Sequence, residues 1–288
     1  NNFRKIMFLL IFSSSVIIIF NSTIILKNGV KERMPEILQN VTLEETHKLI
    51  KNFKNEECLG LKDGCVFNSS SNKKVYIIGD SHAASLAFDL KNKIVSKNYQ
   101  FITSLLGDCG FFPGFNLIDL KTKKIDHNCN DIYFNKLQKK LNESSESIII
   151  FGARFPLYLN NEEFSNKKGV GGEKWKRVYA SNDKFDSLHS SFKDTVNELS
   201  KKNKIILIYP IPEVDVNVPR KLLNQHLKGD LAFIKSFNAQ NSITTSYQIY
   251  KARTKSSFEL FDSIKGKNIY RVYPHKLFCD TLIKDRCL

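Results

Sequence analysis

A serine stands where an apolar strand pattern gives way to a helix pattern. Residues 75–82 read Val-Tyr-Ile-Ile-Gly-Asp-Ser-His, and a helical pattern runs from Ala83 to Val95. This order predicts that a buried strand delivers Ser81 to the first turn of a helix, where backbone N–H groups have no partner within the helix. Such groups can stabilise the oxyanion that forms when a hydroxyl attacks an acyl carbonyl. Ser81 is therefore a candidate nucleophile for acyl chemistry.

The residues around Ser81 support a catalytic turn but do not supply a base. A serine becomes a useful nucleophile when a histidine, itself oriented by a carboxylate, accepts its proton. His82 is the nearest histidine, but adjacent side chains on a helix point in different directions, so we expect it to pack or cap locally. We expect Gly79 and Asp80 to support the turn, with Asp80 accepting hydrogen bonds from backbone amides. The base must therefore come from another part of the chain.

Apolar runs alternate with helical patterns along the chain, which predicts a parallel β-sheet with helices on both faces. The predicted strands cover residues 75–78, 101–105, 147–151, 205–209 and 269–273. The predicted helices cover residues 83–95, 131–141 and 185–199, the second with Ile132, Phe134, Leu137 and Leu141 on one core-facing stripe. Residues 160–184 and 211–245 lack clear periodicity, which predicts long loops at one end of the sheet, where ligands bind in such folds.

The N-terminal region contains an apolar segment that is long enough to cross a bilayer. Residues 6–26 are 21 mostly apolar positions without a charge. As a helix they would extend for about 31 Å, close to the thickness of the hydrocarbon core. We therefore predict a transmembrane helix at 6–26 with residues 1–5 as a cytoplasmic stub. A signal peptide and a buried soluble helix are the alternatives.

The six cysteines lie as three local pairs in the sequence, although other connectivities are open. The pairs are Cys58 with Cys65, Cys109 with Cys129, and Cys279 with Cys287. Disulfides persist outside a reducing cytosol, so this interpretation places the chain after residue 26 on the extracytoplasmic side. The alternative is six free buried thiols. The spacing differs from the double Cys-x-x-Cys of a zinc site, and no metal is expected.

The charge distribution argues against a nucleic-acid partner. The formal net charge is +15, but the lysines are scattered, and no motif places them between stacking aromatic residues. A hydrophobic content of 42% is ordinary for a globular protein. We interpret the charge as a solvated lysine-rich surface.

Several motifs together resemble one known family. The segment at 75–82 looks like the first block of SGNH hydrolases, and specifically of the SGNH domain fused behind acyltransferase family 3 membrane proteins. The other matching features are the loop from Cys58 to Cys65, Cys-Gly-Phe-Phe-Pro at 109–113 with Cys129 downstream, Ile-Ile-Ile-Phe-Gly-Ala-Arg-Phe at 148–155, Tyr-Pro-Ile-Pro-Glu at 209–213, and the pair Cys279 and Cys287. The resemblance covers roughly residues 50–288.

The resemblance implies a fold and a membrane topology. It implies a three-layer, flavodoxin-like SGNH domain over residues 73–288, preceded by an extracytoplasmic linker with a disulfide loop over 27–72. The helix at 6–26 would then stand where the last membrane helix of the fused protein lies. The domain is expected in the periplasm, anchored to the cytoplasmic (inner) membrane.

The resemblance also implies an activity, which is O-acylation, usually O-acetylation, of a cell-surface glycan such as a polysaccharide, lipopolysaccharide or peptidoglycan. An acetyl-CoA-derived acyl donor would arrive through a membrane domain upstream of Asn1, so no cofactor is expected in this domain. The runner-up is a carbohydrate esterase of the same fold, since transfer and hydrolysis differ only in whether a sugar or water is the acceptor. A glycan-binding module without chemistry is the third alternative.

The family carries its catalytic Asp and His in a late Asp-x-x-His motif, a short way beyond the final cysteine pair. The resemblance places that motif beyond Leu288, so we expect the domain to be incomplete at its C-terminus. The sequence has one Asp-x-x-His, from Asp186 to His189. It lies in a helix two strands too early, and we expect no catalytic role for it. His275 is a weaker candidate still.

The oxyanion hole is less clearly marked. In many SGNH hydrolases a glycine and an asparagine from the second and third blocks join the serine amide. Here the second block offers Gly107 or Gly110, and the third offers Arg154 where an asparagine would stand. Arg154 is either a charge partner in the site or a salt-bridged residue at a strand end.

Overall fold

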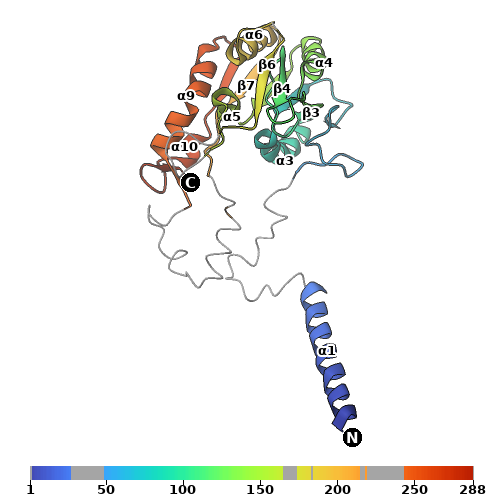
Figure 1. Cartoon of the computed structure of the whole chain (residues 1–288). Coiled ribbons are helices and arrows are strands. Elements are labelled where there is room, and N and C mark those ends of the chain that lie inside the picture. Colours follow the sequence, from blue (N-terminus) through green and yellow to red (C-terminus); the bar gives the residue numbers. More distant parts are fainter. Residues whose placement is uncertain are drawn as a thin grey trace. The chain divides into compact units, whose positions relative to one another are not determined.

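The computed structural model describes residues 2–26, 49–164, 174–182, 184–214, 218 and 243–287 (Figure 1). Contacts divide the chain into two units, Asn1–His47 and Lys48–Leu288, and each is described by itself. Residues 27–48 of the predicted linker lie outside the described residues. So do residues 165–173, 183, 215–217 and 219–242, which belong to the two predicted long loops.

The first unit contains the helix α1, Asn2–Leu26. The stretch Phe3–Leu26 is long and apolar enough to cross a membrane by length and composition. The hydroxyls of Ser13, Ser15 and Thr23 donate to backbone carbonyls three or four residues earlier, at 3.0, 2.8 and 2.8 Å. These polar side chains are therefore satisfied within the helix, which lowers the cost of placing them in an apolar environment.

The second unit is built on a six-stranded sheet with the order β1-β3-β2-β5-β7-β9. Its parallel strands are β2 Lys74–Gly79, β3 Gln100–Leu105, β5 Ile148–Gly152, β7 Lys204–Ile208 and β9 Ile269–Val272. All five predicted strands are confirmed. The short strand β1, Val66–Phe67, adds an antiparallel edge that the sequence pattern did not indicate.

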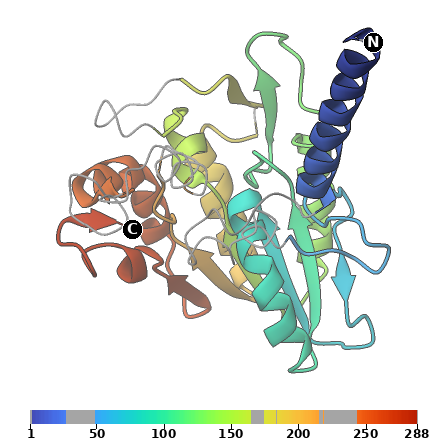
Figure 2. The same cartoon turned by 90° about the horizontal axis from the view of Figure 1, so that it is seen from below.

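Two hydrophobic clusters lie on opposite faces of this sheet, because successive strand residues point to opposite sides. On one face Val75, Ile77 and Phe101 pack with the alanines of α3, Ser81–Val95. The cluster on the other face is larger and contains Tyr76, Ile78, Phe151 and Leu207. These side chains pack with the helices α4 Asp131–Asn142, α6 Leu188–Ser200 and α9 Tyr247–Ser263. The arrangement of helix, sheet and helix agrees with the predicted three-layer α/β class (Figure 2).

The predicted apolar stripe of α4 needs one correction. Phe134, Leu137 and Leu141 are buried, but Ile132 is 83% exposed. Residues 132 and 134 lie about 200° apart around a helix of 3.6 residues per turn, so Ile132 faces away from the other three. The buried stripe therefore consists of Phe134, Leu137 and Leu141, at positions i, i+3 and i+7 of the helix.

Several elements were absent from the sequence prediction. The strand β6, Arg177–Ser181, lies in the first predicted loop and pairs antiparallel with β4, Phe115–Asp119. The strand β8, Thr245–Ser246, begins at the end of the second predicted loop and pairs with β10, Arg286–Cys287. The missed helices are α5 Phe155–Asn160, α9 and α10 His275–Phe278. The two predicted loop regions are thus partly regular structure.

The three local cysteine pairs are disulfides in the structure, as predicted. The bond between Cys58 and Cys65 precedes the first parallel strand, and that between Cys109 and Cys129 joins the segment after β3 to the start of α4. The bond between Cys279 and Cys287 joins the end of α10 to β10.

Candidate functional site

The turn that carries Ser81 depends on a close approach of two parallel strands. Gly79 is the last residue of β2, pairs with Gly152 of β5, and has a φ of +154°. A Cβ atom at Gly79 would lie 1.6 Å from the carbonyl oxygen of Gly152 and 2.9 Å from the Cβ of Ala83. Only glycine fits there without moving the backbone of β5. The Gly79 of the motif is therefore a packing requirement of the sheet edge.

Asp80 caps α3 and is 1% exposed. Its Oδ1 accepts a hydrogen bond from the His82 backbone N–H at 2.8 Å. Its Oδ2 accepts one from the Arg154 backbone N–H at 2.8 Å and one from the Tyr158 hydroxyl at 2.5 Å. One carboxylate thus joins the start of α3 to the segment that follows β5.

Tyr158 keeps its proton in this arrangement. Burial, together with the negative charge of Asp80, raises the pKa of Tyr158 well above its ordinary value. The phenol therefore stays a hydrogen-bond donor to Asp80. Tyr158 was missed in the sequence, where nothing local marks it, because its partner lies 78 positions away.

Ser81 is the first residue of α3 and is exposed at the carboxyl edge of the parallel sheet. The backbone N–H of Leu106 donates to the Gly79 carbonyl at 3.0 Å, so the segment after β3 starts beside the turn. The exposed Gly107 follows directly. Gly110 is buried, and its N–H donates to the Tyr179 hydroxyl at 2.9 Å. Of the two glycines proposed for the oxyanion hole, Gly110 thus has its amide engaged away from Ser81.

A part-buried carboxylate, that of Glu213, lies beside this turn and pairs with two arginines. Arg154 Nε bonds Glu213 Oε1, and Arg253 Nε lies 3.0 Å from Glu213 Oε2. Burial by itself would raise the pKa of Glu213, but Arg154, Arg253 and the His82 ring outweigh it and hold that pKa below its ordinary value. Glu213 is therefore ionised, and the site carries an ordered cluster of charges.

Arg154 forms the salt bridge that one of the two alternatives predicted, and a role of its guanidinium as a charge partner in the site stays a prediction. It is salt-bridged at a strand end, and its backbone N–H is bound to the same Asp80 that caps the helix of Ser81. In the sequence, Glu213 is marked only as the last residue of the run Tyr-Pro-Ile-Pro-Glu at 209–213, which resembles the family. Arg253 was missed, because it lies on the unpredicted helix α9.

The described histidines are His82, His127, His189 and His275, and the hydroxyl of Ser81 has no hydrogen bond to any of them. His189, of the Asp-x-x-His at 186–189, is at the start of α6, and its Nε2 lies 3.4 Å from the Ser256 carbonyl oxygen. Across the described ranges, no group of three or more His, Cys, Asp or Glu side chains is placed to hold a metal ion.

Comparison with known proteins gives a family match over most of the chain. A family model described as the SGNH domain (fused to AT3 domains) matches residues 50–287. No curated protein matches the sequence. A solved structure that is similar is the periplasmic domain of the lipopolysaccharide acetyltransferase of Salmonella ser. Paratyphi A, with 18% identity and a TM-score of 0.46. The match covers 80% of this chain and 77% of that one.

Proposed function

Because the chain belongs to the family of SGNH domains that are fused to AT3 domains, we propose that it O-acylates a cell-surface glycan through an acyl ester on Ser81. The acyl group is acetyl, and the acceptor is a sugar hydroxyl. The main support is the geometry of the turn, which places an exposed serine on the first turn of α3 and fixes that turn through the buried Asp80.

The reaction takes two steps. In the first, the Ser81 oxygen attacks the acyl carbonyl of the donor, its proton passes to a general base, and the base gives that proton to the donor oxygen or sulfur as its bond to the acyl carbon breaks. In the second, a sugar hydroxyl attacks the acyl-serine and gives its proton to the base, which returns it to the Ser81 oxygen as the bond from that oxygen to the acyl carbon breaks. The donor derives from acetyl-CoA and is delivered by a membrane acyltransferase domain upstream of this one.

Each step passes through a tetrahedral oxyanion that needs hydrogen-bond donors. The backbone N–H of Ser81, at the start of α3, is the first such donor. The backbone N–H of Gly107 and the guanidinium of Arg154 are the others in this proposal. Arg154 suits that role because Glu213 holds its Nε while the rest of the guanidinium still carries donors.

The base is the second part of the proposal. Ser81 hydrogen-bonds none of the described histidines, and we assign the base to the late Asp-x-x-His motif that the resembled family carries. The histidine would accept the serine proton and the aspartate would orient its ring.

The membrane placement follows from two features of the chain. The helix α1 has the length and composition of a membrane span, and the three disulfides favour an oxidising compartment for the second unit. We therefore propose that α1 anchors the domain to the cytoplasmic membrane and that the second unit works in the periplasm.

The test uses protein expressed from the whole gene, with Ser81→Ala compared with Ser85→Ala. Ser85 is exposed one turn further along α3, and its hydroxyl donates to the His82 carbonyl at 2.7 Å, so it is a matched control. Intact-mass analysis after incubation with p-nitrophenyl acetate should show one added acetyl group on wild type and Ser85→Ala, and none on Ser81→Ala. Acetylation of folded Ser81→Ala at the wild-type rate would refute the nucleophile.

The same assay separates transfer from hydrolysis. With the host's de-O-acetylated surface polysaccharide present, a transferase gives acetylated glycan as the main product, and an esterase gives free acetate at the same rate with or without glycan. Quantifying both products by NMR distinguishes the two activities.

A further inference from the structure

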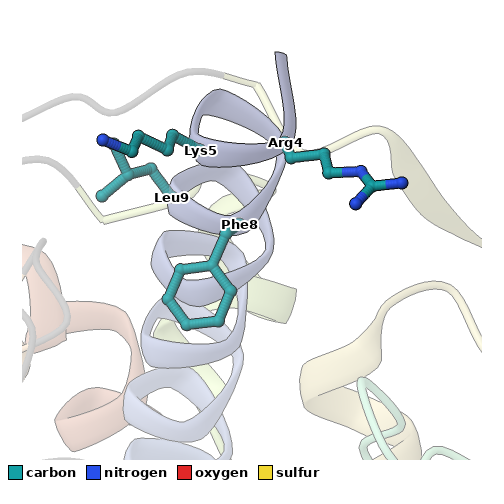
Figure 3. A pocket seen from close by; sticks show the side chains of 4 residues that line it. All are labelled: Arg4, Lys5, Phe8 and Leu9. Carbon is teal, nitrogen blue, oxygen red and sulfur yellow. The ribbon is translucent and has the colours of Figure 1, made fainter. Parts of the chain in front are cut away.

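An open cavity of about 340 Å³ runs along one face of α9, and His275 of α10 also lines it. Its walls carry the aromatic rings of Tyr247, Tyr250 and Phe258, which recur at helical spacing, together with the His275 imidazole. We call this the α9 aromatic pocket. The other hollow of similar size lies between Arg4, Lys5, Phe8 and Leu9 (Figure 3). It is formed by neighbouring side chains of the single helix α1, so it has no second wall.

The rings of the α9 aromatic pocket pack against one another, with Tyr250 buried and Lys251 Nζ 4.5 Å from the centroid of the Tyr247 ring. Tyr247 and Tyr250 are inclined by 30°, Tyr247 and His275 by 31°, and Tyr250 and His275 by 32°, with ring centroids 6.1, 6.5 and 5.6 Å apart. Phe258 meets His275 at 60° and 5.4 Å. Tyr250 is held in place because its hydroxyl donates to the Pro210 carbonyl at 2.8 Å. The partly exposed rings of Tyr247, Phe258 and His275 offer apolar surface, and the C–H faces of a pyranose ring pack against surfaces of this kind.

Polar groups accompany the rings. Nδ1 of His275 is buried and has no hydrogen-bond partner among the described residues. Burial and the neighbouring Lys276 lower the pKa of His275, so the neutral ring has one donor and one acceptor nitrogen. Lys255 and Glu259 line the pocket as an exposed pair 3.8 Å apart. Groups that both donate and accept suit sugar hydroxyls, whereas an acyl chain would leave them without partners.

The pocket lies on the same edge of the sheet as Ser81. Pro210 follows β7 and His275 follows β9, and both strands run parallel to β2, which ends at the Ser81 turn. Three strand spacings separate β2 from β9, a distance of about 14 Å that a short oligosaccharide can cover. In Figure 1, α9 and α10 lie side by side.

The ion-pair cluster of Arg154, Glu213 and Arg253 connects the α9 aromatic pocket with the Ser81 turn. Arg253 lies on α9, one turn away from the pocket residue Tyr250, and its guanidinium binds Glu213. Glu213 in turn binds Arg154, whose backbone is bonded to the cap of the Ser81 helix. The helix that forms the pocket is thus tied to the candidate catalytic turn through direct contacts.

We propose that the α9 aromatic pocket binds a sugar unit of the acceptor glycan, a few units away from the hydroxyl that is acylated at Ser81. The role of this subsite in acyl transfer rests on the proposed function, whereas the binding of a sugar unit in the pocket does not. Its contribution is to hold the glycan chain along the carboxyl edge of the sheet.

The test measures oligosaccharide binding to the protein expressed from the whole gene. The probe is the surface polysaccharide of the strain that carries the gene, de-O-acetylated with mild base and cut to oligosaccharides. Tyr247→Ala should raise the Kd about tenfold or more, and Tyr247→Phe should keep it within about twofold, because the ring and not the hydroxyl makes the contact. Tyr270→Ala is the matched control, since Tyr270 is 48% exposed on β9 and lies outside the pocket lining. The NMR signals of the His275 ring should move in proportion to occupancy.

The outcomes separate the subsite from the chemistry. The subsite would be refuted if folded Tyr247→Ala kept the Kd and KM of wild type, or if the His275 signals did not move at saturation. Acyl transfer by the wild-type protein would still support the proposed function of Ser81 in that case. Binding that depends on Tyr247 in a wild type that transfers no acyl group would support the subsite and refute the proposed enzyme. Ser81→Ala should bind the oligosaccharide as wild type does. Absence of any binding to wild type refutes the subsite directly.

Discussion

Replacing Asp80 by alanine should strongly destabilise the domain, because one buried carboxylate accepts three hydrogen bonds. Loss of the helix cap to His82 N–H costs about 1 kcal/mol. The buried Tyr158 hydroxyl, left without an acceptor, costs about 1–3 kcal/mol, and the part-buried Arg154 N–H adds about 1 kcal/mol. The sum is about 3–5 kcal/mol of unfolding free energy. In a domain of this size that lowers the Tm by roughly 6–20 °C.

The assay is urea denaturation of the purified domain, followed by circular dichroism, with Asp89→Ala as the control. Asp89 is an exposed aspartate on the same helix, so its replacement should change the unfolding free energy by less than about 0.5 kcal/mol. A double-mutant cycle with Tyr158→Phe identifies the mechanism. The second substitution should cost about 1–2 kcal/mol less in the Asp80→Ala background, because the donor has then already lost its acceptor. A loss below about 1 kcal/mol for Asp80→Ala, or full additivity with Tyr158→Phe, would refute this account of the turn.

Two further predictions concern the ion-pair cluster and the last disulfide. Glu213→Gln should lower the unfolding free energy by about 2–4 kcal/mol, because two arginines of low exposure lose their carboxylate. The pKa of Glu213 is lowered on folding from an ordinary value of 4.5, so its contribution is complete above that value and lost as the pH falls through the folded-state pKa. Urea titrations should accordingly show a constant gap between wild type and Glu213→Gln above about pH 5 that closes in more acidic buffer; a gap that widens in acid contradicts this. Replacing both Cys279 and Cys287 by serine should cost about 2.6 kcal/mol of unfolding free energy, from the loss of loop closure. Peptide mapping of unreduced protein should recover the three local pairs, and free thiols throughout would contradict the disulfides.

The sequence predicted best those features that are encoded by neighbouring residues. The five parallel strands are short apolar runs, and the Ser81 turn is marked by four adjacent residues, 79–82. The long helix α9 was missed because three of its buried residues, Arg253, Thr254 and Ser257, are polar, so its core-facing side does not form an apolar stripe in the sequence. The pairing of β4 with β6 was missed for another reason. Phe115 pairs with Ser181, far away along the chain, and a two-residue period cannot indicate which distant segment completes a strand pair.

The candidate site shows the same division between local and distant signals. Gly79, Asp80 and Ser81 could be selected from four adjacent letters, since the turn itself demands them. The residues that hold this turn could not, because Tyr158 lies 78 positions and Arg154 lies 74 positions from Asp80. Contacts at such separations arise from the order of the strands in the sheet.

The place of Arg154 explains why a positive charge is tolerable beside a helix start that is itself electropositive. A free guanidinium there would repel the partial positive charge of the first turn of α3. Glu213 offsets that cost by pairing with Arg154, and Arg154 together with Arg253 lowers the pKa of Glu213 and so keeps it ionised. The cluster of two arginines and one glutamate retains one net positive charge, held in position by these contacts. In the proposed mechanism this charge would be preorganised for the oxyanion of acyl transfer at Ser81, because the donors would need no reorientation during the reaction.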